Sequence, residues 1–191
     1  MTDYFKTFES FQSEKKDNEY TIFCDMDGVL TNFEKRFEEL DSNTEKLSPS
    51  EYDSKHGQYT MWGLIDGGGV EYWSQMEWMP DGQKLWQWLL PYSPKILSAP
   101  SRNPTSAEGK LIWVKNNLNI KQNFYTVNAR KWKPHYKIIF NSQKHLFVRD
   151  KYDILIDDTQ SKIDAWKAAG GTAILHKNTD NTIKELKKLL Y

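Results

Sequence analysis

Two pairs of aspartates are the residues of this sequence best suited to do chemistry together. Asp25 and Asp27 stand in the segment Asp-Met-Asp-Gly, and Asp157 is followed directly by Asp158. Each pair follows a short apolar run, and Ser98 follows a third. Carboxylates packed closely repel one another, and Mg²⁺ relieves that repulsion because it prefers oxygen ligands and takes one or two carboxylates together with a phosphate. The pattern therefore predicts a magnesium-dependent reaction on a phosphate.

Asp25 is the candidate nucleophile of that reaction. Once a cation neutralises the phosphate, one oxygen of Asp25 can attack phosphorus and form an aspartyl-phosphate. Asp27 can protonate the leaving oxygen and later deprotonate the hydrolytic water. Gly28 permits a sharp turn whose backbone N–H groups face the phosphate. The metal is expected on the carboxylates of Asp25 and of Asp157 or Asp158, with the backbone carbonyl of Asp27.

Short apolar runs predict the strands that must position these residues. Five runs are rich in β-branched and aromatic residues, at 20–24, 94–97, 137–140, 153–156 and 172–175. Helical spacing of apolar residues predicts helices between them, at 31–40, 70–78, 83–90, 105–118, 161–169 and 182–190. This alternation predicts a doubly wound α/β fold with a parallel sheet covered on both faces. Ligands of such sheets bind beyond the carboxyl ends of the strands, where both aspartate pairs fall.

The 191 residues fit a single domain with one insertion. The expected core covers about 20–31 and 91–191. A small, mainly helical cap is expected at about 32–90, with 67–69, three consecutive glycines, as a candidate hinge. Residues 1–19 are expected to form a short amphipathic helix or an arm.

Composition narrows the classes of partner. The formal net charge is zero, which argues against a nucleic-acid polymer or an anionic membrane as the partner. No apolar run approaches the roughly 20 residues of a membrane span. The single cysteine, Cys24, allows no intrachain disulfide, which fits a reducing compartment. We expect a cytoplasmic protein that binds a small phosphomonoester, and a homodimer remains open.

The motifs resemble those of a known family. Asp25-Met-Asp-Gly-Val-Leu30 resembles the first motif of the phosphatases of the haloacid dehalogenase superfamily, Leu97-Ser98 the second, and Ile154-Leu-Ile-Asp-Asp158 the fourth. Within that superfamily the chain is most similar to the 5'(3')-deoxyribonucleotidases. That likeness rests on Asn32-Phe33 after the first motif and on Trp78-Met-Pro-Asp-Gly82 before Leu97-Ser-Ala-Pro100, and it covers about residues 20–175.

The resemblance implies roles for further residues. It makes Asp25 the nucleophile and Asp27 the acid/base, with Mg²⁺ on the acidic residues. Ser98 and Arg102 would hold the phosphate. The position after Ser98 often carries another hydroxyl in the family, but here it is Ala99, so one phosphate hydrogen bond would be missing or would be replaced by a backbone N–H.

The lysine of the third motif has three candidates. Ser142-Gln-Lys-His-Leu-Phe147 resembles the start of the family helix that carries this lysine, which favours Lys144. Lys151 also resembles a family motif, but it lies closer to Asp157 than the family spacing suggests. Lys137 ranks third.

Aromatic residues cluster in the expected cap. Trp86 and Trp88 fall on a predicted helix and are expected to pack in the core. The cap aromatics are expected to lie over the phosphate, where flat rings can stack on a base; they are Phe33, Trp62, Trp73 and Trp78.

We therefore expect hydrolysis of a nucleoside monophosphate, with a deoxyribonucleotide favoured. One alternative keeps the mechanism but changes the substrate to a sugar phosphate or another small phosphomonoester. Another alternative is a non-catalytic nucleotide or phosphate binder on the same fold. The presence of both Asp25 and Asp27 argues against it, because a binder needs neither a nucleophile nor an acid two residues away.

Overall fold

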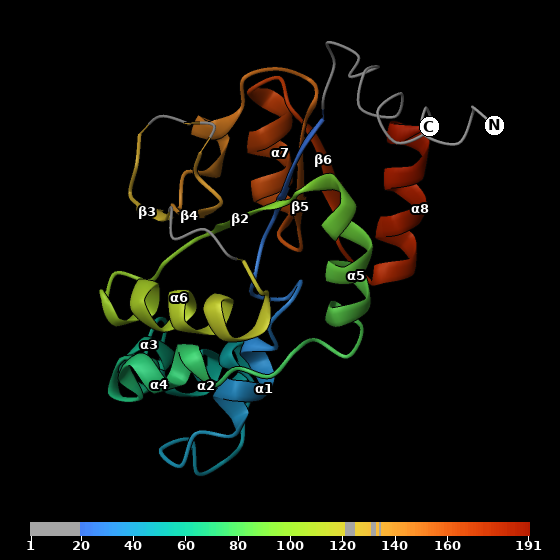
Figure 1. The fold of residues 1–191 in the computed structure, drawn as a ribbon. Helices are drawn as coiled ribbons and strands as arrows, with labels where there is room; N and C mark the ends of the chain where they lie inside the picture. The colour runs from blue at the N-terminus through green and yellow to red at the C-terminus, as the bar shows by residue number, and fades with distance from the viewer. Residues whose placement is uncertain (1–19, 121–124, 131–132, 134) are drawn as a thin grey trace, which may run out of the picture.

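A computed structural model describes residues 20–191 except 121–124, 131–132 and 134. The predicted arm or helix at 1–19 lies outside the described residues. Figure 1 shows a sheet flanked by helices, with a group of short helices and α6 (Thr105–Asn117) gathered beyond one end of the strands. None of the described helices is both long and apolar enough to cross a membrane.

The sheet has six strands, all parallel, in the order β3-β4-β2-β1-β5-β6. Their bounds are β1 Thr21–Cys24, β2 Lys95–Ser98, β3 Tyr125–Val127, β4 Ile138–Phe140, β5 Asp153–Asp157 and β6 Thr172–Leu175. The predicted α/β class with a parallel sheet is confirmed. The edge strand β3 was not predicted.

Alternate residues of the buried strands feed two separate cores, as expected for strands covered on both faces. On one face, Ile22, Ile154 and their neighbours pack beneath α5 (Gly82–Leu89) and α8 (Thr179–Leu190). On the other face, Phe23 and Leu155 pack against Trp166 of α7 (Gln160–Ala168) and Phe147 of the 3₁₀ helix η2 (Lys144–Phe147). A second 3₁₀ turn, η1 (Leu90–Tyr92), leads from α5 towards β2.

Four short helices lie between β1 and α5, and we call the part of the chain that they span, residues 33–74, the cap. They are α1 (Phe33–Glu38), α2 (Pro49–His56), α3 (Met61–Gly67) and α4 (Gly69–Ser74). Ser48 and Glu51 form a capping box that starts α2, with Pro49 at its first position. The glycines at 67–69 form the joint between α3 and α4, and Gly69 adopts a left-handed φ of +54°.

Helix α6 follows β2 but packs against the cap (Figure 1). Gly109 makes this possible, because a Cβ there would lie 2.5 Å from the carbonyl oxygen of Val70 and 2.6 Å from the Cβ of Trp73. The indole N–H of Trp113 donates to the carbonyl of Met76 at 2.7 Å. The cap is therefore held to the core through α6 as well as through its own two ends.

Candidate active site

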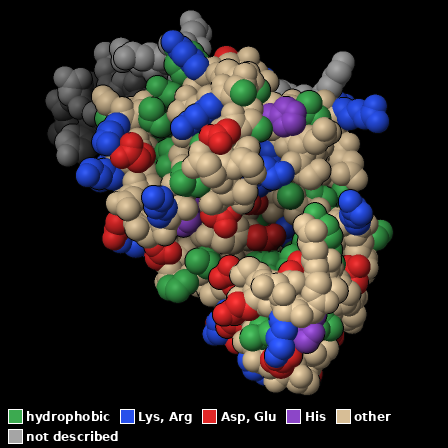
Figure 2. Space-filling view, turned by 180° about the vertical axis from the view of Figure 1, so that it is seen from behind, with side chains coloured by type: hydrophobic (Ala, Val, Ile, Leu, Met, Phe, Trp, Pro, Cys, Tyr) green, Lys and Arg blue, Asp and Glu red, His purple; other side chains and the backbone are tan. Residues whose placement is uncertain are grey.

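A cavity of about 920 Å³ lies between the carboxyl ends of the strands and the cap. Figure 2 shows a hollow in this face of the molecule with acidic side chains gathered in it. Its sheet side is lined by Asp25, Asp27, Lys144, Asp157 and Asp158, and its cap side by Phe33, Tyr59, Met61, Trp62 and Trp73. The parallel sheet thus brings both predicted aspartate pairs to one wall of one cavity.

Asp25 follows β1 directly, and its backbone N–H donates to the carbonyl of Ile156 at 3.0 Å. One carboxylate oxygen, Oδ1, accepts from the backbone N–H of Met26 at 2.7 Å. The other, Oδ2, lies 2.6 Å from the ammonium of Lys144. The side chain is mostly buried yet lines the cavity, so its orientation is fixed while an oxygen stays within reach of a ligand.

Lys144 begins η2 and lies between two carboxylates. Its Nζ is 2.6 Å from Asp25 Oδ2 and 2.6 Å from Asp157 Oδ2, and its side chain is almost fully buried. Burial alone would lower the pKa of this ammonium, but the two carboxylates outweigh burial and raise it above its ordinary value. Lys144 is therefore a fixed positive charge in the floor of the cavity.

Three carboxylates are close enough to share one cation. Ligand oxygens of Asp25, Asp157 and Asp158 all lie within 4.8 Å of one another. Burial, together with repulsion from Asp25, raises the pKa of Asp157. Burial and the negative charges of Asp25 and Asp157 raise the pKa of Asp158 to about 6. An all-oxygen set whose members repel one another suits Mg²⁺, so the residues fit the predicted ion.

Gly28 adopts a left-handed φ of +72°, and it lets Asp158 approach the loop after β1. A Cβ on residue 28 would lie 2.0 Å from Asp158 Oδ2, far inside van der Waals contact. Two constraints therefore require glycine here, the backbone conformation and the space taken by a carboxylate.

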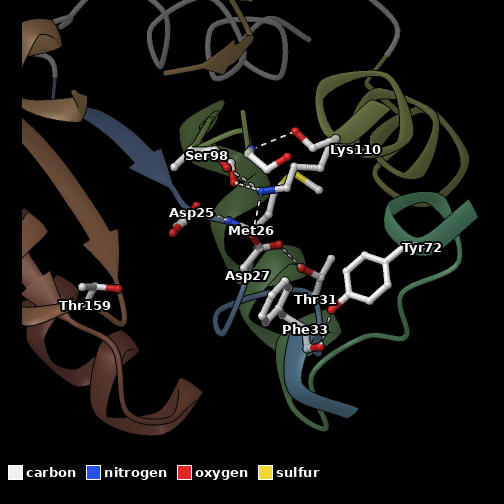
Figure 3. Close-up of polar contacts among 12 residues, drawn as sticks. Asp25, Met26, Asp27, Thr31, Phe33, Tyr72, Ser98, Lys110 and Thr159 are labelled. Atoms are coloured by element: carbon white, nitrogen blue, oxygen red, sulfur yellow. Dashed lines mark hydrogen bonds and ion pairs between the residues drawn. The ribbon is translucent and has the colours of Figure 1, made fainter. Parts of the chain in front are cut away.

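The Asp27 side chain points to a different partner. Its Oδ2 lies 2.6 Å from the ammonium of Lys110, and its Oδ1 accepts from the hydroxyl of Thr31 at 3.1 Å. Figure 3 shows this carboxylate between Lys110 and Thr31. The side chain is 28% exposed and lines the cavity, but it is not in the group of carboxylates that surround the cation position. Asp25 and Asp27 thus have different surroundings.

Sequence reasoning missed Lys110, whose side chain is fully buried on α6. Its Nζ lies 4.9 Å from the centre of the Trp73 ring and bonds to the hydroxyl of Ser98 and the carbonyl of Ala99. Ser98 itself is fully buried and is not among the residues that line the cavity. A phosphate in the cavity would therefore meet Ala99, which lines it, before the Ser98 hydroxyl.

The remaining predicted residues divide into those at the cavity and those away from it. Arg102 lines the cavity and is exposed at its rim. Lys151 and Lys137 precede β5 and β4, at the end of the sheet opposite the cavity. The Lys151 ammonium lies 5.1 Å from the centre of the Tyr152 ring. Of the three candidate lysines, Lys144 alone lines the cavity.

Three of the four predicted cap aromatics line the cavity. Phe33 and Trp62 are half-buried there with ring centres 6.3 Å apart, while Trp73 is buried almost completely. Trp78 does not line the cavity, because its ring packs on Trp113 with the centres 4.8 Å apart. Tyr59, which sequence reasoning did not single out, lies at the cavity and is 66% exposed.

The chain shares its fold with hydrolases of the haloacid dehalogenase superfamily. A hydrolase from Streptococcus pneumoniae superimposes with a TM-score of 0.52 at 13% identity, over 88% of this chain and 99% of that one. A hydrolase of that superfamily from Ehrlichia chaffeensis superimposes with a TM-score of 0.49 at 10% identity, over 90% of this chain and 97% of that one. The L-2-haloacid dehalogenase of Xanthobacter autotrophicus superimposes with a TM-score of 0.48 at 9% identity, over 87% of this chain and 82% of that one. No family model and no curated protein matches the sequence.

Proposed function

We propose that this protein is a Mg²⁺-dependent phosphomonoester hydrolase that acts on nucleoside monophosphates, with 5'(3')-deoxyribonucleotides as the favoured substrates. The observation that carries the proposal is the pairing of two differently held aspartates on one cavity wall. Asp25 lies beside a cation position and a lysine, whereas Asp27 lies beside a different lysine. A nucleophile and a proton donor need such separate surroundings.

The chain's own residues would divide the reaction as follows. An oxygen of Asp25 attacks phosphorus, the bond from phosphorus to the leaving oxygen breaks, and Asp27 gives that oxygen a proton. Water then attacks the aspartyl-phosphate and gives a proton back to Asp27, which releases inorganic phosphate and restores Asp25. Lys144 holds Asp25 in orientation throughout. Mg²⁺ on Asp25, Asp157 and Asp158 would neutralise the phosphate charge.

The proton donor Asp27 also bears on the choice between a phosphatase and a dehalogenase. A halide leaves as a stable anion, so displacing it from carbon requires no proton donor beside the nucleophile. An alkoxide leaving group does require one. The presence of Asp27 on the cavity wall and of a fitting cation position therefore favours a phosphoester over a haloacid.

The cap side of the cavity supports a leaving group with a flat, apolar part. Phe33 and Trp62 present half-buried rings, and Tyr59 adds an exposed ring at the mouth. Stacking on such rings contributes about 1–3 kcal/mol per base. A sugar phosphate has no flat ring system to use them, and this difference separates the two substrate classes.

A phosphate-release screen tests the proposal. Deoxyribonucleoside and ribonucleoside monophosphates and sugar phosphates are compared by phosphate release, and a 2-haloacid is compared by halide release, each with Mg²⁺ and with EDTA. We expect nucleotides to react fastest, only with Mg²⁺, and Asp25→Asn to abolish turnover. Faster turnover of sugar phosphates would replace the nucleotidase assignment, and full activity of Asp25→Asn would refute the mechanism. Nucleotide binding without turnover by the native chain would indicate a binder.

A matched pair of variants tests the aromatic wall. Tyr59→Ala removes an exposed ring at the cavity, and Tyr125→Ala removes an exposed ring on the edge strand β3. We expect Tyr59→Ala to raise the KM of a nucleotide at least about fivefold, the lower end of the stacking energy. Tyr125→Ala should leave it unchanged. Equal KM values for Tyr59→Ala and the native chain would remove the ring from the binding site.

A further inference from the structure

We propose that Lys110 is a positioning residue that holds the proton donor Asp27 against the leaving group and joins the loop after β1 to the loop after β2. This inference rests on the proposed function, because it assigns a task within that reaction. Lys110 lies on α6, outside the expected motifs, and its side chain has no exposed surface.

The Lys110 ammonium uses all of its hydrogen-bond donors within the protein. A lysine ammonium has three donors and no acceptor. The Lys110 Nζ lies within hydrogen-bond distance of three oxygens: Asp27 Oδ2 at 2.6 Å, Ala99 O at 2.7 Å and Ser98 Oγ at 3.1 Å (Figure 3). All three donors therefore have an acceptor supplied by the protein. Lys110 has none left for a phosphate, which distinguishes it from a substrate-binding lysine.

The three acceptors come from two different segments of the chain. Asp27 belongs to the loop after β1, and Ser98 and Ala99 lie at the end of β2. One ammonium thus sets the position of the proton donor relative to Ala99, which lines the cavity. Thr31 holds the second oxygen of Asp27 at 3.1 Å, so both carboxylate oxygens are fixed. Fixed geometry of this kind is what a proton transfer needs.

The cap supports Lys110 from the other side. The ring of Trp73 on α4 lies 4.9 Å from the ammonium, and α4 can approach because Gly109, the preceding residue of α6, has no side chain. A buried cation over an aromatic face is stabilised by the ring. The buried ammonium is therefore held by the β1 loop, the β2 loop and the cap together.

The expected effect of losing Lys110 depends on the leaving group. Phenyl phosphate and 4-nitrophenyl phosphate have nearly the same shape, but 4-nitrophenolate is the more stable anion and needs less protonation as it leaves. A variant with a misplaced Asp27 should lose phenyl phosphate hydrolysis more than 4-nitrophenyl phosphate hydrolysis. A general fault in folding or phosphate binding would reduce both equally. The ratio of the two rates does not depend on the fraction of active enzyme.

The experiment measures kcat/KM for both esters with saturating Mg²⁺. Lys110→Met and Lys110→Gln are compared with Asp27→Asn, and Lys115→Met, an exposed lysine of the same helix, is the control. General acid catalysis contributes about 10²–10⁴-fold, so we expect each Lys110 variant to lower the phenyl to 4-nitrophenyl ratio by about tenfold or more. The ratio should not change in Lys115→Met. Adding Lys110→Met to Asp27→Asn should not lower it further.

Two results would overturn the inference. The first is an unchanged ratio in both Lys110 variants, which includes an equal loss on both esters. The second is a further drop when Lys110→Met is added to Asp27→Asn, because Lys110 would then act independently of Asp27. If the native chain hydrolysed neither ester and no nucleotide of the phosphate-release screen, the proposed function would be refuted instead, and the inference would fall with it.

Discussion

Replacing Lys144 with methionine would leave two buried carboxylates without the ammonium that they share. Lys144 Nζ lies 2.6 Å from Asp25 and 2.6 Å from Asp157, and ligand oxygens of these two aspartates are at most 4.8 Å apart. At an effective dielectric constant of about 20, two like charges at that distance repel by about 3.5 kcal/mol. Removing one partner of a buried ion pair costs about 3–5 kcal/mol. Both routes predict a loss of about 3–5 kcal/mol in unfolding free energy.

The loss of unfolding free energy in Lys144→Met should depend on pH and on Mg²⁺. Burial and Asp25 already raise the pKa of Asp157, and without Lys144 it would rise further. A carboxyl whose pKa is higher in the folded than in the unfolded state loses stabilising free energy as the pH rises through that range. We therefore expect a larger loss at pH 8 than at pH 5. Mg²⁺ should stabilise the variant more than the native chain, because it replaces the missing charge.

The assay is urea unfolding of Lys144→Met and the native chain at pH 5 and pH 8, in EDTA and in Mg²⁺. Lys151→Met is the matched control, because that lysine is exposed and its ammonium contacts the Tyr152 ring but no carboxylate among the residues that the structure describes. Lys151→Met should lower the free energy of unfolding by less than about 1 kcal/mol. A loss for Lys144→Met below about 1 kcal/mol at pH 8, or an equal loss at both pH values, would refute this reasoning.

Three further outcomes follow from individual contacts. Gly28→Ala places a Cβ against Asp158 at a left-handed φ, so calorimetry should show Mg²⁺ affinity weakened at least about tenfold with the circular dichroism spectrum unchanged. Because the pKa of Asp158 is raised to about 6, a proton competes with the ion below that pH, and the apparent Kd for Mg²⁺ should rise between pH 7 and pH 5. Gly109→Ala forces α4 away from α6, and urea unfolding should show a loss of about 1–3 kcal/mol, whereas an unchanged midpoint would contradict this close packing.

The strands that carry the aspartates could be predicted because a strand buried on both faces has a recognisable run of apolar residues in the sequence. Runs such as 153–156 are short, apolar and rich in β-branched residues, and each ends at a polar residue. β3 is an edge strand of three residues whose Tyr125 and Val127 are exposed, and it was not predicted although 124–127 is a short run of aromatic and β-branched residues.

Lys110 could not be found from sequence because its burial is a tertiary effect. A lysine in a predicted amphipathic helix ordinarily points to solvent. Here Gly109 admits a cap helix far away in the sequence, and the lysine is enclosed between that helix and two strand ends. Trp78 shows the same limit, since nothing in its neighbours indicates that it packs on Trp113 and not at the cavity. Lys144 was favoured through family resemblance, because spacing alone offered three lysines.

The two buried lysines offset part of the negative charge that the four aspartates place on the sheet side of the cavity before any ligand arrives. Four aspartates and two ammonium groups leave two negative charges when all are ionised. One divalent cation balances them, whereas a monovalent cation does not. A phosphate dianion would be repelled by the unbalanced wall and would meet a neutral one only after the ion has bound. The arrangement therefore favours an ordered addition, with the metal first and the phosphoester second.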